Sequence, residues 1–121
     1  MTDSKYVIPI QPGYVLVEEP PDYEVVWKEQ PAKLRELAVT CREANTNKVI
    51  VKGSTVNVKL SMMEILMLSK EIAKVKLNVA IIAKHNLTKE HEELFKEVAT
   101  NRGSPIRFFG NEQDAKDWLG I

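Results

Sequence analysis

Apolar runs, polar turns and amphipathic helices follow one another along this chain in a cycle that is repeated three times. The clearest apolar runs are Lys48–Lys52, Asn78–Lys84 and the segment around Ile106–Phe109. Asn78–Lys84 contains five successive apolar residues and is apolar on both faces, which is typical of a parallel strand between layers of helices. The cycle predicts an α/β sandwich with about four helices and a mostly parallel central sheet of four to five strands.

Four segments have the apolar spacing of amphipathic helices. The first begins at Pro31, whose fixed φ suits the first turn of a helix. The other three follow residues that commonly cap helix N-termini: Ser61, Thr88 and Asn111. Glu64 follows Ser61 at the spacing of a capping box. The helix of residues 62–75 is apolar over more than half of its circumference, so we expect it to contact a second surface besides the sheet, or to be deeply buried.

The N-terminal part has a weaker pattern. We expect an irregular or edge-strand extension over residues 1–13, with a short strand at Tyr6–Ile10, followed by a strand at Tyr14–Glu18. Glu24–Trp27 is interpreted as the returning strand of a hairpin, with a lead-in to the first helix as the alternative. Gly53-Ser54 is expected to end one strand, and Thr55–Leu60 is a further strand or an extended loop. Residues 1–121 are expected to form a single domain.

Charge and cysteine content narrow the classes of function. The 17 basic and 17 acidic residues cancel, so no net field favours nucleic acid or an anionic membrane. The apolar stretches are far shorter than the roughly 20 residues of a membrane span, so no transmembrane segment is expected. Cys41 is the only cysteine, which excludes an intramolecular disulfide. These features, with no signal-peptide pattern at the N-terminus, predict a cytoplasmic protein, and nothing indicates a cofactor.

The closing segment carries the most specific family pattern. It consists of Ala99–Gly103 (ATNRG), Arg107–Phe109 (RFF) and Glu112–Leu119, which has the form E-x-x-A-x-x-W-L. This succession resembles the bacterial SpoIIAA-like proteins of the STAS superfamily, the fold of the anti-sigma-factor antagonists. The resemblance implies a non-catalytic regulatory module that docks another protein. It covers residues 14–121 by order of elements but is specific only over about the last twenty residues.

The resemblance also points to a departure at Ser61. In the sigma-regulating members an Asp-Ser-Ser-Gly-like segment carries a serine that a partner kinase phosphorylates. Lys59-Leu60-Ser61-Met62 stands at that position here, without the acidic residue and without the glycine. The capping box explains Ser61 without phosphorylation, and we favour that interpretation. A phosphate at this helix N-terminus would nevertheless be tolerated electrostatically.

The connections after the strands are expected to meet at one edge of the sheet, where ligands usually bind in open parallel sheets. His85 would need an orienting partner and a pocket to act as a general base, so no catalytic residue is assigned. His85 and His91 have no fixed third ligand, so no metal site is assigned either. The candidate binding or regulatory residues are Ser54, Lys59, Ser61, Met62, Met63, His85 and Asn86.

Three functions follow from these patterns. The first is a protein-interaction module that uses the methionine-rich start of the second helix, since methionine surfaces adapt to apolar partners. The second is a carrier of a small apolar or lipid-like ligand, because some SpoIIAA-like proteins resemble Sec14-type lipid binders. An enzyme that uses His85 and Asn86 ranks last. Self-association as a homodimer about the exposed helix face is also compatible with the sequence.

Overall fold

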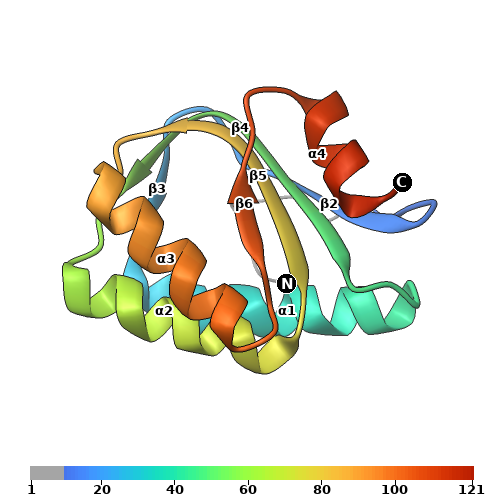
Figure 1. Ribbon diagram of the computed structural model, residues 1–121, viewed down its shortest axis with the longest axis horizontal. Coiled ribbons are helices and arrows are strands. Elements are labelled where there is room, and N and C mark those ends of the chain that lie inside the picture. The colour runs from blue at the N-terminus through green and yellow to red at the C-terminus, as the bar shows by residue number, and fades with distance from the viewer. Residues whose placement is uncertain (1–9) are drawn as a thin grey trace.

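A mostly parallel β-sheet forms the centre of the computed structural model, which describes residues 10–121 (Figure 1). The strand order across the sheet is β1-β2-β4-β5-β6, and β3 also pairs with β4. Every pairing is parallel except that of β1 with β2. The strands are β1 (Ile10–Gln11), β2 (Tyr14–Glu18), β3 (Tyr23–Val25), β4 (Lys48–Val58), β5 (Asn78–His85) and β6 (Ile106–Phe108).

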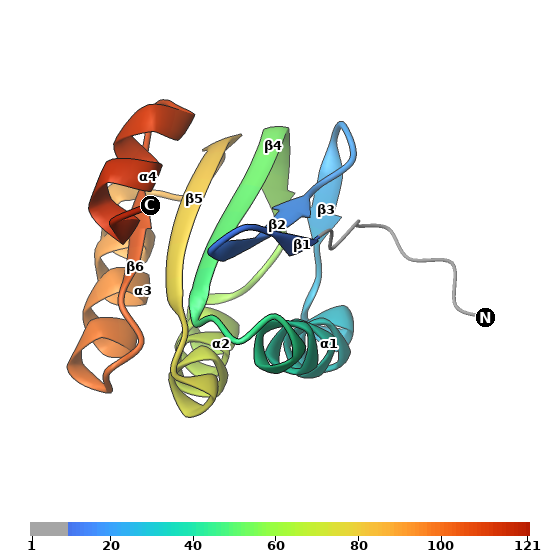
Figure 2. The ribbon, with the colours of Figure 1, turned by 90° about the vertical axis from the view of Figure 1, so that its right-hand side faces the viewer.

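Four α-helices cover the two faces of this sheet. They are α1 (Gln30–Glu43), preceded by the 3-10 turn η1 (Trp27–Glu29), α2 (Met62–Val75), α3 (Lys89–Asn101) and α4 (Glu112–Leu119). Helices α1 and α2 lie side by side along one side of the sheet, and α3 packs next to α2 (Figures 1 and 2). The predicted fold class, α/β with a mostly parallel sheet and four helices, is therefore confirmed.

Alternating strand residues build a separate core on each face. Val15, Val49 and Val79 face α1, α2 and α3, and they pack there with Ile65 and Phe95. The core on the other face is smaller. Its buried residues are Ile50, Ala80, Ala115 and Leu119, the last two from α4. Because successive strand side chains point to opposite faces, two neighbours such as Val49 and Ile50 are both fully buried, which explains the continuous apolar runs in the sequence.

The predicted hairpin between β2 and residues 24–27 is wrong. β3 does form there, but it runs parallel to β4, with Tyr23 beside Val56 and Val25 beside Val58. β2 pairs with β1 and with the first half of β4, so neither of its edges is free for a returning strand. The second half of β4 offers a free edge instead, and β3 occupies it.

Gly53-Ser54 does not end a strand, contrary to prediction. β4 continues through both residues to Val58, and a shift in its pairing with β5 between Lys52 and Thr55 accommodates them. Such an irregularity adds length to one strand without breaking the ladder on either side. The strand predicted at Tyr6–Ile10 lies outside the described residues except for Ile10, which begins β1.

Cys41 lies on the inner side of α1 and is buried. Burial raises the pKa of its thiol from 9.0 to about 11, which lowers the thiolate fraction at pH 8 about 100-fold. We therefore expect iodoacetamide to label Cys41 about 100-fold more slowly in the folded protein than in urea. Because the folded pKa is the higher one, the associated stability is present below pH 9 and lost as the pH rises through 11. Equal labelling rates in both states would contradict this burial.

Candidate functional site

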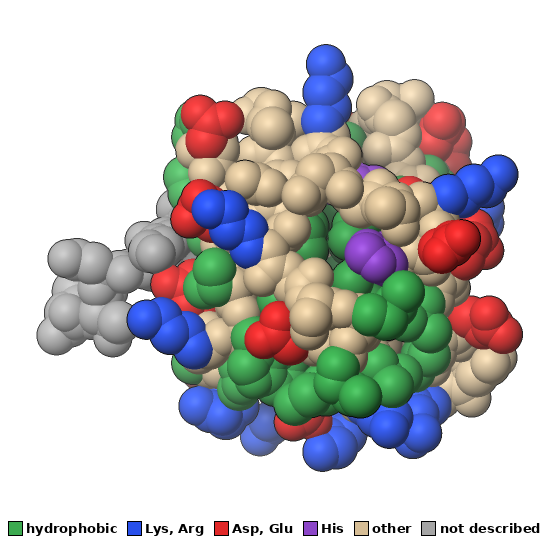
Figure 3. Space-filling view, turned by 90° about the vertical axis from the view of Figure 1, so that its left-hand side faces the viewer, with side chains coloured by type: hydrophobic (Ala, Val, Ile, Leu, Met, Phe, Trp, Pro, Cys, Tyr) green, Lys and Arg blue, Asp and Glu red, His purple; other side chains and the backbone are tan. Residues whose placement is uncertain are grey.

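An apolar cavity lies between the sheet and the layer of α1, α2 and α3. Its volume is about 140 Å³, and every strand from β2 to β6 contributes to its wall. The cavity extends to the edge where β4, β5 and β6 end, which is called the carboxyl edge below. The space-filling view of this side of the molecule shows a hollow in which hydrophobic side chains are visible (Figure 3). Among the described residues that line the cavity, four have polar side chains: Glu19, Gln30, Lys33 and His85.

Glu19 enters the cavity wall because it continues the inner face of β2. Val15 and Val17 point toward the helices, and the same two-residue period directs the Glu19 side chain inward. Its side chain is only 4% exposed, and Oε1 accepts a hydrogen bond from Nζ of Lys33 in the first turns of α1. Its other oxygen, Oε2, is buried and has no hydrogen-bond partner among the described residues.

Lys33 is the cation of this ion pair and is itself 12% exposed. Burial lowers the pKa of Lys33 below its usual range, although the adjacent Glu19 carboxylate acts in the opposite direction. The ammonium group also lies 4.5 Å from the centre of the Tyr23 ring. Burial, with the negative charges of Glu19 and Glu29, raises the pKa of Tyr23 to about 12. The carboxylate, the ammonium group and the phenol thus form a compact polar cluster at the side of an apolar space.

Gly53 provides the room that Glu19 occupies. A Cβ atom at position 53 would lie 3.2 Å from Cβ of Glu19 and 3.2 Å from Cγ2 of Val56. These separations are tighter than ordinary van der Waals contact, so a side chain at this position would displace its neighbours. The glycine that was expected to end a strand therefore serves the approach of β2 to β4.

His85 is the last residue of β5 rather than part of the following loop, and it lies at the carboxyl edge. Its ring packs against Phe108 with 4.9 Å between ring centres. Nδ1 accepts a hydrogen bond from the Leu87 N–H at 3.2 Å, and Nε2 is 3.4 Å from Oε2 of Glu92. Because Nδ1 is an acceptor, the ring proton is assigned to Nε2, facing the carboxylate.

Asn86 closes the carboxyl edge beside His85. Its side-chain oxygen accepts from the Val58 N–H at 2.7 Å, and its side-chain nitrogen donates to the Val58 carbonyl at 3.1 Å. Both bonds extend the β4–β5 ladder by one side chain. Asn86 therefore has a structural role, because its side chain completes the backbone hydrogen bonds at the end of β4.

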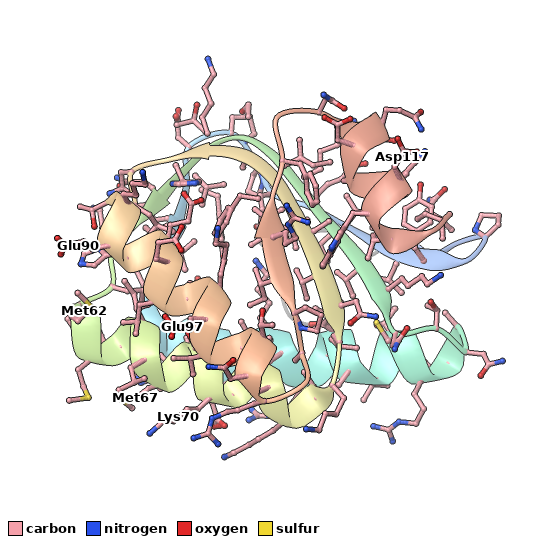
Figure 4. The ribbon with its side chains drawn as sticks, in the orientation of Figure 1. Met62, Met67, Lys70, Glu90, Glu97 and Asp117 are labelled. Carbon is pink, nitrogen blue, oxygen red and sulfur yellow. The ribbon has the colours of Figure 1, made fainter. Side chains whose placement is uncertain are left out.

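Ser61, Met62 and Met63 begin α2 at the same edge, directly after the cavity-lining residue Leu60. Met62, Met63 and Met67 are 46%, 63% and 40% exposed, and they are called the methionine face below. Met62 and Met67 project away from the sheet (Figure 4). We expected α2 to have more apolar surface than its contact with the sheet covers. The exposed fractions of the three methionines agree with this expectation.

Ser54 lies away from these residues, whereas Lys59 follows the end of β4 at the same edge. Ser54 is an exposed residue in the middle of β4, since the strand runs four residues beyond it. Lys59 pairs with Glu24 at 2.7 Å, and both side chains are about half exposed. The structure brings His85, Asn86 and the start of α2 to one edge, as the sequence predicted, but it leaves Ser54 outside that group.

Ser61 forms both bonds of the predicted capping box. Its Oγ accepts from the Glu64 N–H at 3.2 Å, and the Ser61 N–H donates to Oε1 of Glu64 at 2.9 Å. We expect Ser61→Ala to lower the free energy of unfolding by about 1 kcal/mol, measured by urea denaturation, because the helix loses a cap. Ser61→Asp should retain most of the stability, and Ser54→Ala is the control, with a change within about 0.5 kcal/mol. A Ser61→Ala variant as stable as the parent would exclude the capping role.

Sequence reasoning missed Glu19 and Lys33, the charged pair of the cavity. A signal for Glu19 exists, because it stands two residues after Val17 on the inward phase of β2. No comparable signal exists for Lys33, which occupies a polar position of an amphipathic helix. Its burial depends on how α1 crosses the sheet.

Comparisons with known proteins add no assignment. No protein-family model matches the chain, and no functionally curated protein matches it significantly. Among the described residues, no helix is both long and apolar enough to cross a bilayer. Residues 10–121 also contain no group of three His, Cys, Asp or Glu side chains placed to hold a metal ion. The fold and the cavity thus define the class, an α/β protein with an apolar internal cavity, and the SpoIIAA-like resemblance stays a prediction.

Proposed function

We propose that this protein is a non-catalytic binding module that takes a small apolar ligand into the cavity between its sheet and helices. The observation that supports this most is the cavity itself, about 140 Å³ with walls that are almost entirely aliphatic and aromatic. An engineered cavity of about 150 Å³ with similar walls binds benzene, so a ligand of roughly that size fits. The SpoIIAA-like resemblance implies a non-catalytic module as well.

Catalysis ranks behind binding for a chemical reason. His85 has Glu92 as an orienting carboxylate, which is part of what a general base needs. Among the described residues that line the cavity, however, none is a Ser, Thr or Cys that such a base could activate.

The proposal is tested by adding benzene to the purified protein and recording amide chemical shifts by NMR. We expect saturable shifts at residues that line the cavity, together with a rise in thermal stability. Ala83→Leu should weaken or abolish both effects because Ala83 lines the cavity and the larger side chain fills it. Ala32→Leu, at an exposed position of α1, is the matched control. Shifts that stay the same in the Ala83→Leu variant would contradict binding in this cavity.

Protein interaction through the methionine face is a second candidate function. Of the three exposed methionines, Met67 lines a surface groove of about 370 Å³. The groove is also lined by Lys70, Lys74, Lys76 and Arg102, with Glu71 among them. Figure 4 shows Met67 and Lys70 on the outer side of α2. A complementary partner would present an apolar strip with acidic residues beside it. A second copy of this chain is the alternative occupant, because flexible methionines adapt to many shapes.

Sedimentation and pull-down experiments separate these occupants. If the protein self-associates through the methionine face, Met63→Glu should convert a dimer to a monomer in sedimentation velocity. If the partner is another protein, the same substitution should abolish its capture while the protein stays monomeric. Val39→Glu, at an exposed apolar position of α1, is the matched control. A monomer in sedimentation velocity that captures no partner above background would count against this second function. So would capture of a partner that is unchanged in Met63→Glu.

A further inference from the structure

The cavity has one polar group that the protein leaves unsatisfied. Oε1 of Glu19 is bonded to Lys33, whereas Oε2 is buried and has no hydrogen-bond partner among the described residues. An unsatisfied buried acceptor is costly, and the cost is larger when the group carries charge. Glu19 lines the cavity, so its carboxyl group lies beside the space that a molecule inside would occupy.

The charges at this end of the cavity restrict what that molecule can be. Glu19 and Lys33 form an ion pair, and the negative charge of Glu29 also acts on Lys33. A neutral ligand adds no further charge to this cluster. An anionic ligand would bring its charge next to Glu19, and a cationic ligand would bring its charge next to Lys33. Each would also lose its hydration in an apolar space, which is expensive without a counterion of its own.

We propose that the ligand is a neutral molecule with an apolar body about the size of a benzene ring and one hydroxyl group, such as a phenol or a small alcohol. The hydroxyl donates to Oε2 of Glu19, and the apolar body packs against the aliphatic side chains that line the cavity. Lys33 acts as a positioning residue that holds the Glu19 carboxylate in place. This inference rests on the proposed function, because it names the ligand class of the same cavity.

The test compares four probes of one ring size by NMR titration: phenol, benzene, benzoate and benzylammonium. We expect phenol to bind about tenfold or more tightly than benzene, since a hydrogen bond to a charged group has at least that worth. Benzoate and benzylammonium should bind more weakly than either. The double variant Glu19→Leu/Lys33→Met should still bind benzene but should lose the preference for phenol, because both charges are replaced by apolar groups together.

The outcomes separate this inference from the proposed function. If benzene binds as tightly as phenol, the proposed role of Glu19 is overturned, and water would be the group that satisfies Oε2. The cavity would still be a binding site. Benzoate or benzylammonium as the tightest probe would overturn the neutral class in favour of an ionic anchor. If no probe shifts the cavity residues, both the inference and the proposed function fail. If the double variant does not fold, the ratio of phenol affinity to benzene affinity in the parent protein is by itself the test of the hydrogen bond to Glu19.

Discussion

Lys33→Met is expected to lower the free energy of unfolding by about 3 to 5 kcal/mol at pH 7. Methionine retains most of the volume of the lysine stem but removes the ammonium group that pairs with Glu19. The Glu19 carboxylate, which is 4% exposed, would then be a buried charge without a counterion. Urea denaturation followed by circular dichroism measures the loss.

Two further variants isolate the cause of this loss. Lys74→Met makes the same substitution in an exposed ion pair with Glu71, whose N–O distance is 2.8 Å, and should change stability by less than about 0.5 kcal/mol. Glu19→Leu/Lys33→Met removes both charges and should recover most of the stability lost in the single variant, since apolar replacement of a buried pair is often neutral. If the free energy of unfolding of Lys33→Met were within about 1 kcal/mol of that of the parent, the buried ion pair would be contradicted.

Phe95→Ala is expected to destabilise the protein by about 3 to 5 kcal/mol. Phe95 is buried on the inner side of α3 and meets the ring of Phe108 edge to face, with 6.5 Å between their centres. Its ring also forms part of the cavity wall, so the space left by truncation would merge with a volume that is already empty. Neighbouring side chains cannot collapse far enough to fill it. The unfolding midpoint in urea and its slope measure the loss.

The control for this variant lies on the other face of the sheet. Phe109 is half-buried against Trp118, with 5.7 Å between ring centres, and it does not line the cavity. Phe109→Ala should therefore cost about half as much, and benzene should not restore its stability. Benzene should restore part of the stability of the Phe95→Ala variant, because a bound ligand favours the folded state. Equal losses at the two positions would contradict the special place of Phe95 at the cavity.

Features that depend on neighbours in sequence could be predicted well. The capping box of Ser61 and Glu64 requires only a spacing of three residues, and both of its bonds form. Thr88 and Asn111 cap α3 and α4 for the same reason, and each accepts from the N–H three residues later. The burial of Val15 and Val17 follows from the two-residue period of a strand. The order of elements and the α/β class come from these local signals.

Features that depend on which strand edge is free could not be predicted. The chain was expected to reverse and return as a hairpin strand at Glu24–Trp27, but β1 and β4 already occupy both edges of β2. The chain therefore continues in the same direction as β3 along the remaining edge of β4. Gly53 was expected to stop a strand, whereas its missing side chain allows the close approach of Glu19. A local pattern cannot distinguish these cases, because the deciding contacts join residues far apart in the chain.

The features of the candidate site also fall into those that the sequence predicts and those that appear only in the tertiary structure. The sequence by itself determined the elements, their caps, the two-sided burial of the central strands and the methionines at the start of α2, since each follows from helical or strand periodicity and local hydrogen bonding. Only the tertiary structure decided that a cavity remains between the layers and that Glu19 and Lys33 meet at its side. The reason is physical: a cavity and a buried ion pair depend on how α1 is placed against the sheet, and that placement results from the packing of the whole core.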